Sequence, residues 1–277
     1  MLKSRIITAI ILLFLLLLAL FALPSFWWAA LVVAMVMQGA FEWSRLSGLK
    51  CWKARFYWAA TLLLMLWLLW ADAGIAETQR VYLHLAVYAV SAFLWLLVVP
   101  AWLMSGWKIK QPLLMKLTGW AVLIPTGLAM LDLREADPSP WILLFVMGLV
   151  WVADSAAYFA GRRFGRNKLA PSISPGKTWE GVAGALLGVS VYVVLIGSLT
   201  AYFVDRGILL TVLLPISWCW VMLAVIGDLF ESAIKRQAGM KDSGALLPGH
   251  GGLLDRIDAL TPTLPLAAMV LLLQRIA

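Results

Sequence analysis

The residues best suited to chemistry lie between Ser232 and Asp258, in the stretch SAIKRQAGMKDSGALLPGHGGLLDRID. It contains four basic residues, three acidic residues, one histidine and five glycines, whereas most of the chain is continuous apolar sequence. Charged side chains are costly to keep in a membrane protein, and glycine lets a backbone approach a ligand closely. Basic and acidic side chains interleaved in this way indicate a site for a phosphorylated, metal-bound substrate.

A polar stripe leads into this stretch. Asp228, Glu231, Ser232 and Lys235 are spaced i, i+3, i+4 and i+7, which predicts that they share one face of a helix. At 1.5 Å per residue, the stripe is about 10 Å long. For Asp228 taken alone, the alternative is a buried carboxylate that is paired with a basic residue of another helix.

The loop that follows predicts an anion-binding turn. Gly249, Gly251 and Gly252 surround His250, and backbone amides in such a turn can face an anion. The histidine is either a base or a side chain that holds the loop by hydrogen bonds. Lys241 and Asp242 stand before this turn as a further charged pair.

Acidic residues flank the loop on both sides. Asp228 precedes it, and Asp255 follows it with Arg256 and Asp258 close by. Magnesium in proteins typically takes one or two carboxylates together with phosphate oxygens and water. The pair Asp228 and Asp255 therefore predicts a site for one magnesium ion or two.

A second polar segment lies upstream. Asp154 and Tyr158 are four residues apart on a predicted helix, and Ser174, Lys177 and Thr178 lead into the next one. Thr178 is a candidate helix cap, so that the helix N-terminus and Lys177 would offer an anion site. The Gly-Lys-Thr triplet is not a P-loop, because the required first glycine is replaced by Pro171 and no strand is predicted before it.

Hydropathy predicts an all-α, polytopic integral membrane protein. The chain is 63% hydrophobic and 13% charged, and its long apolar runs suit a lipid bilayer. The sequence predicts one membrane domain over residues 1–277, with motif-poor helices in 1–135 and the catalytic helices and loops in 139–277. About nine spans are predicted, at residues 5–23, 26–45, 57–75, 81–104, 113–131, 139–161, 178–203, 209–234 and 260–275.

The basic residues predict the orientation. Eighteen of the 22 arginines and lysines fall on the side that carries the N-terminus and both polar segments. This excess marks the cytoplasmic side, so we expect the site to face the cytoplasm from a plasma or bacterial inner membrane. The net charge of +8 is spread over loops rather than along one face, which argues against nucleic acid as a partner.

Three glycines mark one side of the predicted span 178–203. Gly184 and Gly188 form a GxxxG pattern, with Gly181 on the same side. Such a face supports close helix packing within the fold or, alternatively, a homodimer through this span.

The stretch from Ser232 to Asp258 resembles the signature of the phosphatidate cytidylyltransferase family, also called CDP-diacylglycerol synthase. In that signature a serine, a Lys-Arg pair, a Lys-Asp pair, HGG and DR-x-D stand at fixed spacing. The matching residues here are Ser232, Lys235-Arg236, Lys241-Asp242, His250-Gly251-Gly252 and Asp255-Arg256-x-Asp258. The upstream SPGKTWEG is similar to a second segment of the family.

The resemblance implies transfer of a cytidylyl group from CTP to phosphatidic acid, which gives CDP-diacylglycerol and pyrophosphate with magnesium as cofactor. It implies Asp228 and Asp255 as metal ligands. Catalytic roles are expected for these two acids together with Lys235, His250 and Asp258. Substrate binding is expected from Lys235, Arg236, Lys241, Asp242, Arg256, Ser174, Lys177, Thr178 and Asp154.

Two other functions remain open from the residues. An ion-coupled transporter would use Asp154, Asp228 and Glu231 along a path. Inverted repeats are typical of such proteins and are not seen here, because the charged residues of interest lie in the last 130 residues near one face. The other alternative is a related enzyme that activates a different lipid phosphate or phosphorylates an isoprenoid alcohol.

Overall fold

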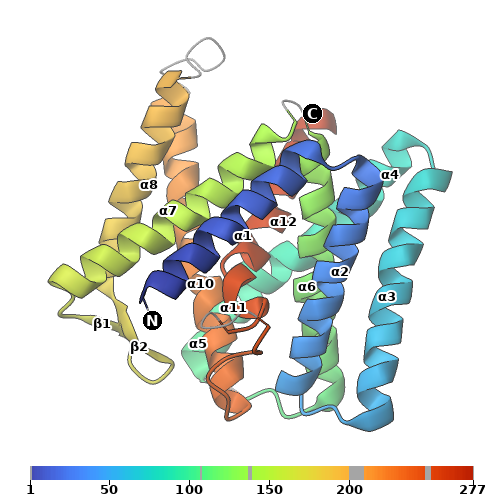
Figure 1. Ribbon diagram of the computed structural model, residues 1–277, viewed down its shortest axis with the longest axis horizontal. Helices are drawn as coiled ribbons and strands as arrows, with labels where there is room; N and C mark the ends of the chain where they lie inside the picture. Colours follow the sequence, from blue (N-terminus) through green and yellow to red (C-terminus); the bar gives the residue numbers. More distant parts are fainter. Residues whose placement is uncertain (1, 107, 137–138, 200–208, 247–250, 277) are drawn as a thin grey trace.

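The structure is a computed structural model that describes residues 2–106, 108–136, 139–199, 209–246 and 251–276 (Figure 1). It is built almost entirely from helices, as expected for the predicted fold class. The α-helices are α1 (Leu2–Ala22), α2 (Ser25–Leu46), α3 (Cys51–Gly74), α4 (Glu77–Phe93), α5 (Val99–Ser105), α6 (Pro112–Glu135), α7 (Trp141–Phe164), α8 (Trp179–Leu199), α10 (Leu214–Gln237), α11 (Leu254–Ile257) and α12 (Leu260–Ile276).

The described helices include seven that are long and apolar enough to cross a membrane. These seven confirm a polytopic, all-α membrane protein. The other two apolar segments, Ile10–Ala22 and Leu260–Ile276, are shorter. The predicted count of nine spans is therefore not confirmed, although helices lie at all nine predicted places.

One span is less regular than its hydropathy predicts. Residues 77–105 form one continuous helical rod, but the π-helical segment η1 (Leu94–Val98) separates α4 from α5. Pro100 is the second residue after this segment and has no backbone N–H to donate to the preceding turn. A π turn before a proline accommodates that missing hydrogen bond within the helix. A second π segment, η2 (Leu209–Leu213), precedes α10.

A small β-hairpin precedes α8, and the sequence did not predict it. Strand β1 (Lys168–Ala170) pairs antiparallel with β2 (Ser174–Thr178), with Lys168 opposite Thr178 and Ala170 opposite Ser174. The expectation that no strand precedes the Gly-Lys-Thr triplet was therefore wrong, because β2 contains that triplet. The glycine spacing still excludes a P-loop.

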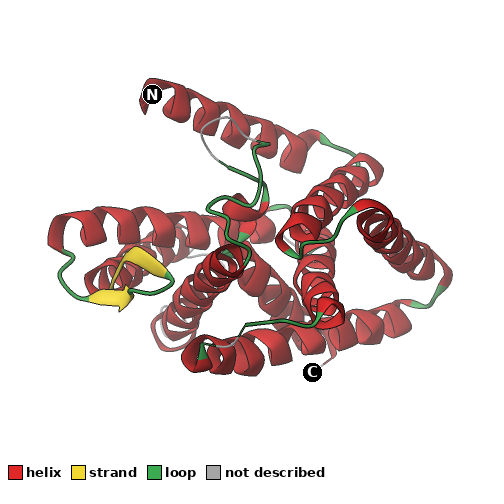
Figure 2. Ribbon diagram, turned by 90° about the horizontal axis from the view of Figure 1, so that it is seen from below, coloured by secondary structure: helices red, strands yellow, loops and turns green. Residues whose placement is uncertain are grey.

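The connections group at the two ends of the helices. The α2–α3 turn, the α5–α6 loop, the hairpin and the loop after α10 lie together at the lower end in Figure 1, and Figure 2 views this end. The C-terminus and the α3–α4 connection lie at the other end. This grouping matches the predicted alternation of the loops between the two sides.

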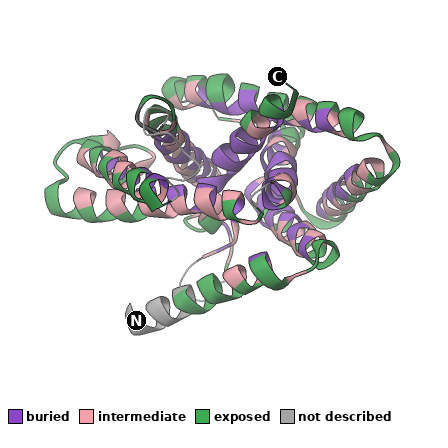
Figure 3. Cartoon of the chain, turned by 90° about the horizontal axis from the view of Figure 1, so that it is seen from above, coloured by how far each residue is buried: buried purple, intermediate pink, exposed green. Residues whose placement is uncertain are grey.

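The buried residues lie where α2, α6, α10 and α12 meet, and the outward faces of the helices are exposed (Figure 3). Nine consecutive residues of α12, from Leu260 to Ala268, are buried, so this short helix runs through the centre. By contrast, α7 and α8 pack mainly on each other.

The glycines of α8 serve this packing. A Cβ on Gly184 would collide with the Cβ of Ala160, and one on Gly188 would lie 2.6 Å from the Cβ of Ala156. Both alanines belong to α7. The glycine face is therefore used within the fold, which is the first of the two predicted alternatives.

Ionisable side chains are also buried outside the last 130 residues, contrary to expectation. The imidazole of His84 on α4 lies between Asp132 of α6, at 2.8 Å, and Asp72 of α3, at 2.9 Å. The hydroxyl of Tyr88 donates to the same Asp132 at 2.7 Å. This cluster joins three helices far along the chain from the Ser232–Asp258 stretch. A second buried acid, Glu42 of α2, lies close to that stretch.

Candidate active site

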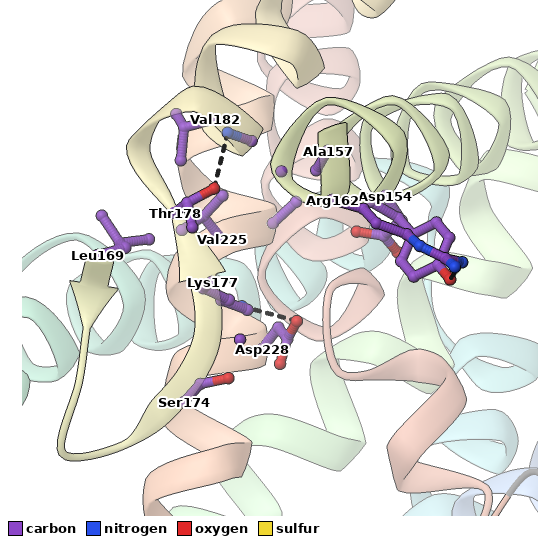
Figure 4. A pocket seen from close by; sticks show the side chains of 15 residues that line it. Asp154, Ala157, Arg162, Leu169, Ser174, Lys177, Thr178, Val182, Val225 and Asp228 are labelled. Carbon is purple, nitrogen blue, oxygen red and sulfur yellow. Dashed lines mark hydrogen bonds and ion pairs between the residues drawn. The ribbon is translucent and has the colours of Figure 1, made fainter. Parts of the chain in front are cut away.

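A cavity of about 570 Å³ opens between α7, α8, α10 and the hairpin. Its walls carry five of the predicted site residues, which come from α7, β2 and α10 (Figure 4). They are Asp154, Ser174, Lys177, Thr178 and Asp228. The two polar segments predicted separately from the sequence are thus brought together at one site.

Lys177 and Asp228 form the central contact of this cavity. Lys177 Nζ at the end of β2 lies 2.6 Å from Asp228 Oδ2 on α10. The other oxygen of Asp228 accepts a hydrogen bond of 3.3 Å from Ser232, one turn later. The side chains of Lys177 and Asp228 are 22% and 34% exposed, so an incoming phosphate or cation can reach both. The alternative of a buried Asp228 paired with a basic residue of another helix is met only in part, because Asp228 has a basic partner but is one-third exposed, and Lys177 lies on a strand.

Thr178 caps α8 as the sequence predicts. Its buried hydroxyl oxygen accepts a hydrogen bond of 3.1 Å from the N–H of Gly181 at the start of the helix. Asn167, before the hairpin, donates from its side chain to Glu180 at 2.8 Å. These contacts fix β2 and the helix start, and so fix Lys177 at the cavity wall.

The α7 side of the cavity carries Asp154 and, one turn later, Tyr158. Arg162 Nη1 donates a hydrogen bond of 3.0 Å to the hydroxyl of Tyr158. This keeps one basic side chain at the rim, across the cavity from Lys177 (Figure 4).

Lys235 lies at the end of the predicted polar stripe and binds two acids. Its Nζ is 2.5 Å from Asp255 Oδ1 and 3.4 Å from Glu231 Oε2. The side chains of all three are at most 12% exposed. The stripe on α10 is therefore confirmed, and it tethers the segment that follows the loop.

Asp255 is held by donors on both oxygens. Its Oδ2 accepts from the N–H of Ser243 at 2.9 Å, from the hydroxyl of Ser243 at 2.9 Å and from the N–H of Gly252 at 2.8 Å. Burial raises the pKa of this carboxyl, but the contacts with Lys235, Gly252 and Ser243 outweigh it and lower the pKa below its usual value. Asp255 is thus a fixed anion.

The glycines of the loop are required by this arrangement. Gly251 has a φ of 81°, a conformation that side chains disfavour, and a Cβ there would lie 2.6 Å from Asp255 Oδ2. A Cβ on Gly252 would collide with the hydroxyl of Ser243 and the carboxylate of Glu42. On α10, a Cβ at Gly227 would lie 2.5 Å from the carbonyl oxygen of Asp258, so this glycine lets the two segments approach.

Acids gather between α10 and α12 in a way that fits a hard cation. Burial, followed by the negative charges of Asp228 and Glu231, raises the pKa of Asp258 well above its usual value. Both carboxylate oxygens of Glu231 are buried and accept no hydrogen bond, although the ammonium of Lys235 lies 3.4 Å from Oε2. A buried carboxylate with so few partners suits magnesium, which prefers carboxylate ligands. No three acid, histidine or cysteine side chains of the described residues form a ready-made cage, so phosphate oxygens and water would have to complete the shell.

The other predicted substrate-binding residues lie outside the cavity wall. Arg236, Lys241, Asp242 and Arg256 are exposed, and Arg236 Nε donates to the carbonyl of Ile173 in the hairpin at 3.5 Å. His250 lies outside the described residues. The structure thus places Asp154, Ser174, Lys177, Thr178 and Asp228 in the cavity wall, while Lys235 and Asp255 form an adjoining, more buried group.

Sequence reasoning missed Glu42, which is fully buried on α2. It accepts hydrogen bonds from Ser243, Leu253 and Leu254, all in the segment that holds Asp255. A signal was present, because Glu42 is the sole acid in the 22 residues of α2, and charge within a span is costly. Ser243, which touches both Glu42 and Asp255, was also missed; its position just after the Lys-Asp pair was the available hint.

Known proteins resemble this chain over its whole length. A model of the cytidylyltransferase family matches residues 3–274. The phosphatidate cytidylyltransferase of Haemophilus influenzae is 40% identical over 96% of each chain. That of Pseudomonas aeruginosa is 38% identical over 98% of this chain and 97% of its own length. That of Staphylococcus saprophyticus is 46% identical over about half of each chain. The chain belongs to the cytidylyltransferase family.

Proposed function

We propose that this protein transfers the cytidylyl group of CTP to phosphatidic acid, releasing CDP-diacylglycerol and pyrophosphate. The observation that carries the proposal is the cavity in which Lys177 and Asp228 meet between apolar helices. Family membership and two full-length relatives named phosphatidate cytidylyltransferase support the choice of substrates.

The chemistry requires little from a base. A phosphate oxygen of the lipid, already anionic at neutral pH, attacks the α-phosphorus of CTP, and the bond to the bridging oxygen of pyrophosphate breaks. The barrier lies in bringing two polyanions together and in stabilising negative charge on the leaving group. Lys177 and Arg162 at the cavity, together with the exposed side chains of Arg236, Lys241 and Arg256, are the cations that would serve this purpose.

We propose magnesium as the cofactor, held by Asp228 and Asp255 with Glu231 nearby. The buried carboxylate of Glu231, which accepts no hydrogen bond, and the negative charges around Asp258 support a cation at this place. When bound, magnesium would neutralise charge on the phosphates and on departing pyrophosphate. Lys177 contacts Asp228, and Lys235 contacts Asp255 and keeps it ionised.

The cavity suits a lipid substrate that stays in the bilayer. Its walls come from three helices that are apolar enough to cross a membrane, so a lipid phosphate can reach Lys177 while its chains remain in the membrane. We propose that the site faces the cytoplasm from the inner membrane, because 18 of the 22 basic residues accompany it. A homodimer through α8 would have to use the exposed face with Leu187, Val191 and Leu195, because the glycine face packs on α7.

The direct test uses purified protein in detergent with phosphatidic acid, labelled CTP and magnesium. We expect release of pyrophosphate and a labelled liponucleotide, both lost when a chelator removes magnesium. Diacylglycerol or an isoprenoid alcohol in place of phosphatidic acid should give no product. If the alcohol is phosphorylated instead, the protein is a lipid kinase, and if no pyrophosphate is released at all, the proposal fails.

A further inference from the structure

Glu42 lies on α2, about 200 residues before the Ser232–Asp258 stretch, yet it contacts that stretch directly. Its side chain is fully buried, and its two oxygens accept four hydrogen bonds. One comes from Gln38 on the same helix, at 2.8 Å. The other three come from the loop that surrounds Asp255. An acid buried this deeply is costly unless its oxygens are satisfied, so this placement is highly specific.

The three loop contacts define the position of α11. The N–H groups of Leu253 and Leu254 donate to Oε1 and Oε2 at 2.8 and 2.9 Å. These amides precede Asp255 directly, so the carboxylate of Glu42 fixes the backbone from which Asp255 projects. The hydroxyl oxygen of Ser243 lies 2.8 Å from Glu42 Oε2 and 2.9 Å from Asp255 Oδ2, so its single proton is shared between the two acids and one side chain links them.

The loop is packed closely around this carboxylate. A Cβ on Gly244 would lie 2.9 Å from Glu42 Oε1, and one on Gly252 would collide with Oε2. Two glycines of the loop therefore leave the space that the carboxylate fills. The fit requires the length and shape of glutamate as well as its capacity to accept hydrogen bonds.

We propose that Glu42 is a positioning residue that sets the place of Asp255 for the reaction. It does not line the cavity, so its effect passes through α11, Ser243 and Gly252. The inference rests on the proposed function as regards catalysis. The structural part, that Glu42 orders residues 252–255, stands independently of it.

Substitutions of Glu42 can separate the contribution of its hydrogen-bond acceptors from that of its size. Glu42→Gln keeps the shape but turns one acceptor oxygen into an N–H donor, which then faces backbone N–H groups that also donate. Glu42→Asp keeps both acceptors and is shorter by one methylene. Thr61→Val is a matched control, because Thr61 is also fully buried, donates to Tyr57 and accepts from Trp120, and lies away from the loop.

The first measurement is steady-state pyrophosphate release as magnesium and CTP are varied. We expect Glu42→Gln to lower kcat by at least about tenfold and to raise the magnesium concentration for half-maximal activity, with the KM for CTP changed less. Glu42→Asp should recover part of kcat. Thr61→Val should lower the melting temperature while leaving kcat and the magnesium dependence unchanged. Equal kcat and magnesium dependence for wild type and folded Glu42→Gln would overturn the proposal.

The second measurement does not depend on activity. Hydrogen exchange of the backbone amides at 252–254, in detergent without substrate, should be at least about tenfold faster in Glu42→Gln than in wild type, and unchanged in Thr61→Val. If Glu42→Gln does not fold, exchange at the same amides is compared between the wild type and the variants Glu42→Asp and Ser243→Ala. Unchanged exchange at these amides would refute the role of Glu42. If the wild type releases no pyrophosphate, while exchange at 252–254 is still slower in the wild type than in Glu42→Gln, the proposed function is refuted and the role of Glu42 in ordering the loop stands.

Discussion

At the scale of single residues, the two acids predicted as metal ligands differ in their surroundings. Asp228 is one-third exposed and has one lysine and one serine as partners. Asp255 is 7% exposed and accepts one ammonium contact and three further hydrogen bonds. The first is accessible to a cation, whereas the second is also part of the framework of the loop.

The two acids should therefore respond differently to the same substitution. Asp228→Asn and Asp255→Asn are each expected to lower kcat by about a hundredfold or more, because each removes charge compensation for the phosphates. Asp255→Asn should also cost about 3 kcal/mol of stability, since it leaves buried Lys235 with a weaker partner. Pyrophosphate release and thermal unfolding in detergent measure both effects. Near-normal kcat in either variant would contradict its role, and an unchanged unfolding temperature for Asp255→Asn would contradict the framework role.

Substitutions of Lys235 and Lys241, the two lysines of the signature, should also have different effects. Lys241→Gln removes an exposed cation, so we expect a KM for CTP raised by about tenfold at an unchanged unfolding temperature. Lys235→Gln removes the partner of two buried acids, so we expect lower kcat together with a lower unfolding temperature. The comparison uses CTP titrations at fixed phosphatidic acid and phosphatidic acid titrations at fixed CTP. If Lys241→Gln raises the KM for phosphatidic acid and leaves that for CTP unchanged, the assignment of Lys241 to the nucleotide is reversed.

The site residues differ in how far the sequence could predict them. Asp228, Glu231, Ser232 and Lys235 follow from helical spacing alone, and their contacts confirm the shared face. The Lys177–Asp228 pair could not be predicted, because it depends on how a hairpin places Lys177 beside α10. The contacts of Glu42 could not be predicted for the same reason, since hydrogen bonds across about 200 residues leave no local pattern; the only sequence signal for Glu42 was a charge within a predicted span.

At the scale of elements, the α7–α8 pair determines the cavity. The two helices contact along the glycine face of α8, and the cavity opens at the end where Asp154 and Thr178 lie. Hydropathy predicted both helices within a few residues, because long apolar runs identify spans reliably. It could not predict the hairpin, since Lys168–Thr178 contains two prolines and no alternation of apolar and polar residues.

The glycine face gives an element-scale prediction. Gly184→Ala should lower the unfolding temperature and weaken the binding of both CTP and phosphatidic acid. The added methyl group collides with Ala160 and separates α7 from α8. Gly74→Ala at the end of α3 is the control, since a Cβ there meets nothing within 4 Å. Thermal unfolding and light scattering in detergent measure stability and size. A dimer that Gly184→Ala dissociates without loss of stability would instead show that this face joins two copies.

At the scale of the whole molecule, the site lies at one end of the helices with the connections that carry most of the basic residues. The fold brings segments from α2, α7, α8, α10 and α11 to that end. The opposite end carries the His84 cluster near the ends of α3 and α6. The two ends thus differ in composition, and that difference predicts which end faces the cytoplasm.

Orientation can be tested by labelling single cysteines in intact cells with a membrane-impermeant maleimide. In a background with Cys51 and Cys219 replaced by serine, a cysteine at Glu135, exposed at the opposite end, should react from outside. Cysteines at Lys168 in the hairpin and at Ala245 in the loop should react only after the cells are opened, because the positive-inside rule places their end in the cytoplasm. Reaction of position 168 or 245 from outside would reverse the orientation. The site would then lie away from the compartment where CTP is made, and the proposed substrates could not meet there.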